Sequence, residues 1–251
     1  MKRIFLIICL LVAAITLLSC NNPEAKSGEA TVYGVTGACP VSVKVKVDGD
    51  GKVLEAEFNE YLSVYDIGKV DNNGKKYGVE IAEVENGYAK YVKVGDKTFV
   101  CEEGIYTCDE IMGTDKTFDG YMAGDGGRWY ISQVREGNFD IVDRSGNSYG
   151  VPFTEYDDYK LDKNIWADKM KNGYHEGVEY DSGWKENIYS LVTHIKNHGF
   201  YEYTGEEKPS GNKNTYKIGK YDTLVDLENF HDYMQLAQKA YNEAKEQVKN
   251  S

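Results

Sequence analysis

The stretch that decides the fold is Cys39–Tyr61, "CPVSVKVKVDGDGKVLEAEFNEY". Its first half alternates valine with serine and lysine, and its second half alternates apolar residues with glutamate and asparagine. The apolar positions are Val41, Val43, Val45 and Val47, then Leu54, Ala56 and Phe58. Two period-2 runs around an Asp-Gly tract predict a β-hairpin with one buried face.

The tract Asp48-Gly49-Asp50-Gly51 between the two runs also invites comparison with a calcium-binding loop. In an EF-hand loop the fifth position supplies a ligand and the twelfth a bidentate glutamate. Lys52 and Asn59 occupy those positions here. The tract therefore predicts a turn.

Downstream, strand patterns recur at 77–86 and 88–101, with turn residues between them. Residues 118–150 are expected to hold a glycine-rich loop and two more strand-like pieces, with the loop beside an aromatic cluster of Tyr121, Trp129 and Tyr130. No clean internal repeat emerges.

The last third of the chain has helical periodicity. Residues 184–198 carry an apolar stripe at helical spacing, and a second apolar face runs from Phe230 to Tyr241. His194 and His198 are four residues apart, but without nearby cysteine or carboxylate ligands they are expected on a solvated face. Strands first and helices late predict an α+β fold, an antiparallel-rich sheet of hairpins packed against C-terminal helices. We expect the hairpin 41–58 to pack against helices at 184–198 and 227–245.

The chain begins "MKRIFLIICLLVAAITLLSC". Lys2 and Arg3 precede an apolar run that is too short to span a bilayer comfortably, as in a signal peptide. The ending Leu17-Leu18-Ser19-Cys20 resembles a bacterial lipobox, which implies cleavage before Cys20 and its acylation. This divides the chain into a signal peptide (1–19), a flexible tether (20–29) and a mature domain (30–251), with a possible inserted subdomain around 95–160.

Net charge, cysteine content and the motifs of the sequence limit the classes of function that we expect for this chain. The chain has 29 Lys and Arg against 41 Asp and Glu, a net charge of −12, which disfavours nucleic-acid binding. Outside the cytoplasm Cys101 and Cys108 could form a disulfide across "CEEGIYTC", or both could stay as thiols. Neither a nucleophile elbow, a phosphate-binding loop nor a zinc helix is present, so no catalytic or metal-binding residues are assigned and an enzyme is not expected.

Several segments together resemble the FMN-binding lipoproteins of Gram-positive and related bacteria, which include pheromone-precursor lipoproteins and extracellular electron-transfer flavoproteins. The matching segments occur in the family's order and cover most of the mature chain. They are "VSVKVKVDGDGKVLEAEFNEYL", "YAKYVKVGDKTF", "GRWYISQVREG", "SGWKENIYSLVTHIKNHGF" and "TLVDLENFHDYMQLAQKAY". The resemblance implies an FMN-binding-domain-like fold.

In that family a Ser/Thr-Gly-Ala-Thr element precedes the last helix, and a flavin transferase esterifies its second threonine to the phosphate of FMN. The resemblance places this acceptor at Thr223, with Asp222 and Leu224 beside it as cofactor-binding positions. The sequence departs from the pattern, because Tyr221-Asp222 stands where Gly-Ala is expected. Thr223 is therefore either an attachment point or, with Asp222 or Asp226, a cap of the final helix.

The function implied by the resemblance is that of a lipid-anchored, extracytoplasmic FMN-binding protein, a surface electron carrier. Its partners would be the membrane, a flavin transferase and redox proteins. The alternative is a flavin-free binding or surface-antigen lipoprotein that retains the same fold.

Overall fold

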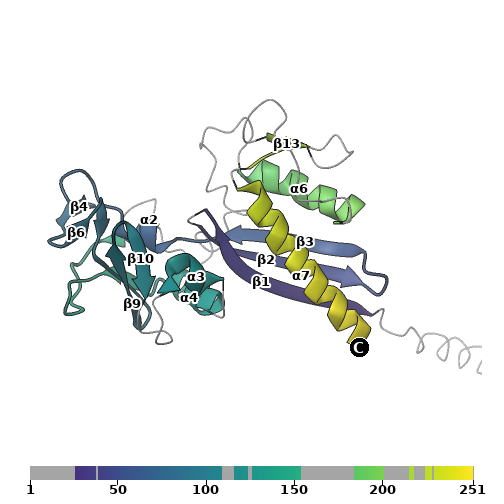
Figure 1. The fold of residues 1–251 in the computed structure, drawn as a ribbon, viewed down its shortest axis with the longest axis horizontal. Helices are drawn as coiled ribbons and strands as arrows, with labels where there is room; N and C mark the ends of the chain where they lie inside the picture. The colour runs from purple at the N-terminus through teal and green to yellow at the C-terminus, as the bar shows by residue number, and fades with distance from the viewer. Residues whose placement is uncertain are drawn as a thin grey trace, which may run out of the picture.

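The computed structural model describes residues 26–37, 39–108, 116–123, 126–153, 184–200, 215–217, 224–227 and 229–250. These residues form two lobes, each with its own hydrophobic core (Figure 1). The first lobe combines the start and the end of the chain: strands β1 (Ser27–Thr36), β2 (Cys39–Asp48) and β3 (Val53–Glu60), with helices α6 (Trp184–His198) and α7 (Phe230–Asn250). The second lobe is built from the sequence between β3 and α6.

The three-stranded antiparallel sheet of the first lobe has the order β1-β2-β3. Val43 lies opposite Val32 of β1 on one side and Phe58 of β3 on the other, so one apolar row crosses all three strands. The four valines of β2 are fully buried on this face. The hairpin predicted at 41–58 is confirmed, and the tract 48–51 is its turn. Leu54 was expected on the buried face but is exposed, because the register shifts between Lys46 and Val47 and Val53 lies opposite Val47 instead.

Helix α7 crosses β1 and β2, and α6 lies beside β3 and contributes to the same core (Figure 1). The close approach of α7 depends on small residues on both sides. A Cβ at Gly28 would overlap the backbone carbonyl of Ala244, and one at Gly34 would lie 2.7 Å from a methyl carbon of Leu236. The predicted packing of the hairpin against both helices is thus confirmed, with α7 beginning at Phe230 rather than at 227.

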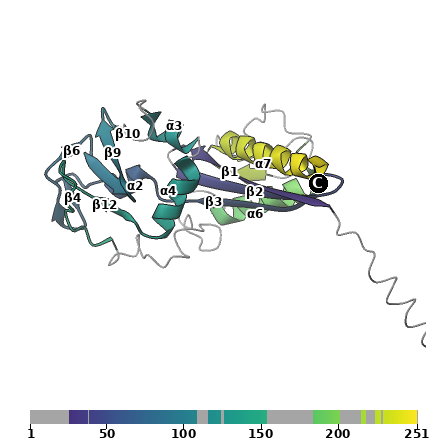
Figure 2. The same cartoon turned by 90° about the horizontal axis from the view of Figure 1, so that it is seen from below.

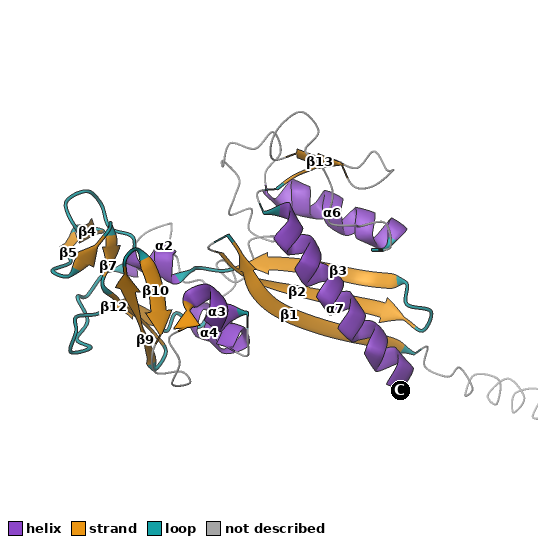
Figure 3. Cartoon of the chain, viewed as in Figure 1, coloured by secondary structure: helices purple, strands orange, loops and turns teal. Residues whose placement is uncertain are grey.

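The second lobe contains a five-stranded antiparallel sheet with the order β11-β10-β9-β8-β12. Figure 3 shows strands β9, β10 and β12 of this lobe together with helices α2, α3 and α4. Its core is aromatic, with Phe99, Tyr106, Phe118 and Tyr130 all fully buried. The elements of this lobe are α2 (Val64–Gly68), β4 (Lys75–Lys76), β5 (Val79–Glu80), β6 (Val84–Glu85), β7 (Tyr88–Ala89), β8 (Tyr91–Val94), β9 (Lys97–Glu102), β10 (Ile105–Cys108), β11 (Lys116–Thr117), α3 (Phe118–Met122), α4 (Gly126–Arg135) and β12 (Phe139–Ile141).

Two-residue turns shape this lobe. Tyr77-Gly78, Asn86-Gly87 and Glu103-Gly104 each have positive φ at both residues and join β4 to β5, β6 to β7 and β9 to β10. This is the backbone of a type I′ turn, whose twist matches that of the strands it joins.

A short repeat also appears, which the sequence reading missed. Residues 70–78 and 142–150 share the pattern Val-Asp-x-x-Gly-x-x-Tyr-Gly. In both copies the Asp carboxylate, from Asp71 or Asp143, accepts hydrogen bonds from the backbone N–H groups two and four residues later. The hairpin turn at Asp48 has the same arrangement.

Three expectations from the sequence differ from the structure. Residues 118–150 contain two helices and the single named strand β12, because the buried residues Gly127, Ile131 and Val134 follow helical rather than alternating spacing. Strand β1 begins at Ser27, inside the segment assigned to the tether. The second core draws on residues from Tyr61 to Phe153, a longer segment than the inserted 95–160. The aromatic contact of Tyr121 with Trp129 is present as expected.

Candidate functional site

The polar face of the β1-β2-β3 sheet is the floor of a cleft. Two rows of side chains cross it, Thr31–Lys44–Glu57 and Tyr33–Ser42–Asn59. Helix α4 of the second lobe forms the opposite wall, and the enclosed volume is about 360 Å³. Figure 2 shows α7 along one side of the sheet and α4 at its end. A volume of this size lies at the lower end of the range for small-molecule sites.

Helix α4 is held against the sheet at its N-terminus. A Cβ at Gly127 would lie 2.8 Å from the Cβ of Tyr33, so only glycine permits this approach of helix and strand. One turn along, the hydroxyl of Tyr130 donates a 3.0 Å hydrogen bond to the backbone carbonyl of Leu62, where the chain enters the second lobe. These contacts fix the direction in which the helix presents its remaining faces.

The face of α4 that lines the cleft carries Arg128, Ser132 and Arg135, together with the buried Ile131. Positions i, i+4 and i+7 of a helix lie on one side, so the two guanidinium groups are presented along the same wall. Both arginines are exposed, and neither forms an ion pair with any residue in the part of the chain that the structure describes.

Positive charge predominates in the cleft. Three cationic side chains line it, Lys44 and the two arginines, against the single carboxylate of Glu57. The ammonium of Lys44 is 3.2 Å from a carboxylate oxygen of Glu29, and this contact raises the pKa of Lys44. Lys44 is thus already paired with a carboxylate. The two arginines are therefore the cations that remain available to a ligand.

The floor of the cleft is polar and largely buried. The hydroxyl groups of Ser42 and Tyr61 are hydrogen-bonded to each other at 2.9 Å. Burial raises the pKa of Tyr61, an effect that the hydrogen bond with Ser42 and the positive charge of Arg135 oppose. Next to this pair, the amide Nδ2 of Asn59 donates a 2.8 Å hydrogen bond to Glu57.

This arrangement can hold a small anion. Guanidinium groups match the geometry of carboxylates and phosphates, and a partly enclosed site strengthens the attraction. Among the described residues no three His, Cys, Asp or Glu side chains gather as a metal site would require.

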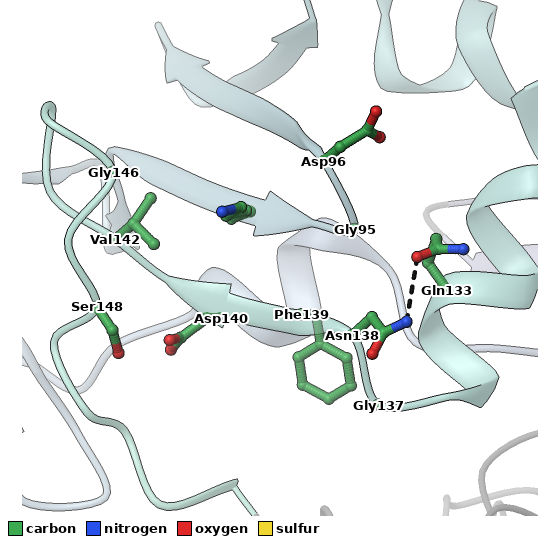
Figure 4. A pocket seen from close by; sticks show the side chains of 11 residues that line it. Gly95, Asp96, Gln133, Gly137, Asn138, Phe139, Asp140, Val142, Gly146 and Ser148 are labelled. Carbon is green, nitrogen blue, oxygen red and sulfur yellow. Dashed lines mark hydrogen bonds between the residues drawn. The ribbon is translucent and has the colours of Figure 1, made fainter.

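A larger groove of about 610 Å³ lies on the second lobe, beside β8 and β12 (Figure 4). Its labelled carboxylates, Asp96 and Asp140, stand on opposite sides and do not converge. The amide of Asn138 is already hydrogen-bonded within the protein: its Nδ2 donates to Oε1 of Gln133 at 3.2 Å. We therefore place the candidate site in the smaller α4 cleft, where the cations share one wall.

Three of the six site residues predicted from the sequence fall outside the described residues: Cys20, Asp222 and Thr223. Leu224 is the first residue of β14 (Leu224–Asp226), which pairs with β13 (Thr215–Lys217) and packs beside α6. The flavin attachment at Thr223 stays a prediction.

Cys101 and Cys108 are both present as thiols. The Sγ atom of Cys101 contacts the carbonyl of Glu85 at 4.0 Å, and that of Cys108 contacts the carbonyl of Thr98 at 3.6 Å. Burial raises the pKa of the Cys101 thiol. The disulfide left open by the sequence is not formed in this structure.

The solvated face expected for the two histidines of α6 is wrong for His194, which is buried. Its ring lies 4.9 Å from that of His198, centroid to centroid.

The residues of the cleft were not identified from the sequence. Arg128 and Arg135 lie in a segment that was expected to form a glycine-rich loop and strand-like pieces, and Asn59 was not assigned to any site. A helical reading of 126–135 would have placed Arg128, Ser132 and Arg135 on one face, which was the available signal.

No protein-family model matches this chain, and no curated protein or solved structure matches it either. Within the described ranges, no helix is long and apolar enough to cross a membrane. Function therefore has to be inferred from the cleft and its charges.

Proposed function

We propose that this protein is a lipid-anchored, extracytoplasmic binding protein that takes a small anion in the α4 cleft. The observation that carries the proposal is the pair Arg128 and Arg135, which share one wall of the cleft without a carboxylate partner among the described residues. The chain as a whole has a net charge of −12, whereas three cations and one carboxylate line this cleft.

Electrostatics supports the same conclusion. Two like charges held on one helix wall repel each other, and the attraction of a bound anion to both would offset that repulsion. Arginine also binds planar or tetrahedral oxyanions in a bidentate manner that lysine cannot reproduce. The buried floor adds polar groups that can orient such a ligand once it is bound.

The location is inferred from the N-terminal segment. Acylation of Cys20 after cleavage at Ser19 would hold the protein at the cell membrane or the outer surface. The membrane would then be a partner through the lipid, and the cleft would meet ligands outside the cytoplasm.

A second candidate is an FMN-binding electron carrier. It is supported by the packing of the last helix α7 across the opening hairpin, the two segments that begin and end the family resemblance. FMN would supply redox chemistry, with a flavin transferase and redox proteins as partners. This chain would hold it either by a phosphodiester at Thr223 or by its phosphate at Arg128 and Arg135.

The anion-binding proposal is tested by calorimetric titration of the mature chain, made soluble by Cys20→Ser, with inorganic phosphate and with citrate. The double variant Arg128→Gln/Arg135→Gln should weaken binding at least about tenfold, since each charge-assisted hydrogen bond contributes about 1.5–3 kcal/mol. Arg144→Gln, which removes the same charge from an exposed turn outside the cleft, is the matched control. Equal affinity of wild type and double variant would overturn the proposal, as would absence of binding to both anions.

The two modes of holding FMN separate on a denaturing gel. After co-expression with a flavin transferase, flavin esterified to Thr223 stays with the denatured chain and fluoresces, whereas flavin held only in the cleft is released. Thr223→Val should abolish a fluorescent band, and Tyr221→Gly with Asp222→Ala should strengthen it. A band that survives Thr223→Val would place the attachment elsewhere, and a colourless native protein would rule out the flavin candidate.

A further inference from the structure

The floor of the α4 cleft contains a hydrogen-bond acceptor without a donor. Asn59 is 8% exposed and lines the cleft between Glu57 and Tyr61. Its Oδ1 atom is buried and accepts no hydrogen bond, and it is the one buried side-chain atom of this kind among the described residues. Such atoms are uncommon in folded proteins and call for an explanation.

The orientation of the Asn59 amide is fixed by its neighbour. Nδ2 donates to Oε1 of Glu57 at 2.8 Å, along the same face of β3. Rotating the amide by half a turn would set its carbonyl oxygen against that carboxylate, which is repulsive. Oδ1 is therefore the acceptor that remains on this side chain.

The nearby polar groups donate no hydrogen bond to Oδ1 of Asn59. The hydroxyl groups of Ser42 and Tyr61 bond to each other, and the guanidinium groups of Arg128 and Arg135 make no hydrogen bond to Asn59. Among the described residues, none donates a hydrogen bond to Oδ1.

We infer that the ligand of the α4 cleft is an anion that also carries a neutral hydroxyl group, a hydroxylated phosphate ester or a hydroxycarboxylate. The inference rests on the proposed function, because the anionic group is assigned to the arginine wall. The hydroxyl group would donate to Oδ1 of Asn59 on the floor. An ammonium donor is disfavoured, because Lys44, Arg128 and Arg135 already make the cleft positive.

Asn59 then acts as the residue that selects among anions. The arginine wall attracts any small anion, whereas the floor distinguishes a ligand that can donate a hydrogen bond from one that cannot. Sites that are built to pair with a ligand hydroxyl reject analogues that lack it, because the buried protein group is then left unpaired.

Matched ligand pairs test this selection by calorimetric titration of the soluble full-length mature chain. Glycerol 3-phosphate is compared with n-propyl phosphate, and lactate with propionate, so that each pair differs chiefly in hydroxyl groups. We expect the hydroxylated member to bind about tenfold more tightly in at least one pair, and the better pair identifies the anionic group. Asn59→Leu should bring the two members of that pair within about twofold of each other.

The outcomes separate the two levels of the proposal. If wild type binds none of the four compounds, the anion site itself fails. If it binds both members of each pair equally, the site stands and the role of Asn59 is overturned, with solvent meeting its acceptor. The comparison of ligands on wild type needs no variant, so it remains decisive even if Asn59→Leu does not fold. Selectivity that persists in a folded Asn59→Leu variant would also overturn the role of Asn59.

Discussion

The two faces of the β1-β2-β3 sheet come from the same alternating sequence, but one face is part of the hydrophobic core and the other lines a polar cleft. On one face Val43 and its neighbours are sealed beneath α7 and beside α6, and the side chains of β2 are fully buried. On the other face Lys44 and its neighbours line the cleft, together with residues of α4. Successive residues of one strand thus alternate between the hydrophobic core and the polar cleft.

The difference teaches where a binding site can arise in such a fold. Complete coverage demands apolar side chains, because few polar groups would find partners there. Partial coverage of a polar face by a helix from another lobe removes water from some polar groups without supplying protein partners for all of them. Asn59 is the example, a buried residue of the cleft whose Oδ1 atom accepts no hydrogen bond.

Breaking the covered face should have the largest effect. Val45→Asp places a carboxylate in a fully buried position, and with the lost apolar burial we expect destabilisation above about 4 kcal/mol. Lys46→Gln, the next residue on the opposite face, should change stability by no more than about 0.5 kcal/mol. Thermal melting followed by circular dichroism reports both. Cooperative melting of Val45→Asp near the wild-type temperature would refute the packing described here.

A subtler change on the covered face tests the contact between strand and helix. Gly28→Ala would force a methyl group into the carbonyl of Ala244 in α7, so we expect a loss of about 1–3 kcal/mol. Gly49→Ala is the matched control, because its new Cβ would make only ordinary contacts, at 3.5 Å. Urea denaturation of the two variants should differ accordingly, and equal midpoints would mean that α7 can shift without loss.

On the partly covered face, Gly127→Ala should displace α4 from Tyr33. Its Cβ would be 2.8 Å from both the Cβ of Tyr33 and the carbonyl oxygen of Met122, which predicts a loss of about 1–2 kcal/mol. Because the arginine wall moves with the helix, affinity for phosphate should fall severalfold as well. Calorimetry on the variant measures this, and a destabilised variant with unchanged affinity would show that the arginines do not depend on this contact.

The smallest effect is expected from the hydroxyl pair on the floor. Ser42→Ala, Tyr61→Phe and the double variant form a cycle whose coupling energy should be about 1 kcal/mol, the usual net contribution of a buried hydrogen bond. Urea denaturation of the four proteins gives this value. A coupling energy near zero would mean that the pair adds nothing to the floor.

The same tyrosine predicts a dependence on alkaline pH. Burial raises the pKa of Tyr61 above its usual value near 10, so the neutral phenol is favoured in the folded state. Its contribution to stability is complete below the unfolded pKa and is lost as pH rises through the folded pKa. Tyr61→Phe should therefore lose less stability than wild type when both are melted between neutral pH and about pH 11.

Local patterns predicted the first lobe well. The alternation around Val43 and the helical spacing of Ile188 and Leu191 each report on one element with one apolar side, and such sides have to meet. The same logic failed at 126–135, because a short segment with Trp129, Tyr130 and Ile131 in succession suits a strand as well as a helix.

The cleft could not be predicted for a different reason. Arg128 and Asn59 are 69 positions apart in sequence and belong to different lobes, so their meeting depends on how α4 docks on the sheet. That docking is decided by a glycine at 127 and a tyrosine at 33, neither of which carries a distinctive pattern. The burial of His194 was missed for the same reason, since it depends on what covers α6.

If Cys20 is acylated as proposed, the direction of β1 bears on how far the cleft would stand from the membrane. Ser27 begins the strand beside the hairpin turn at Asp48, whereas Tyr33, which lines the cleft, is six residues further along. Six residues of antiparallel strand span roughly 20 Å. The negative surface potential of a bilayer decays within a Debye length, about 8 Å at physiological ionic strength. With the strand pointing away from the bilayer, an anion would reach the arginines from bulk solution, where phospholipid headgroups neither repel it nor compete for its place.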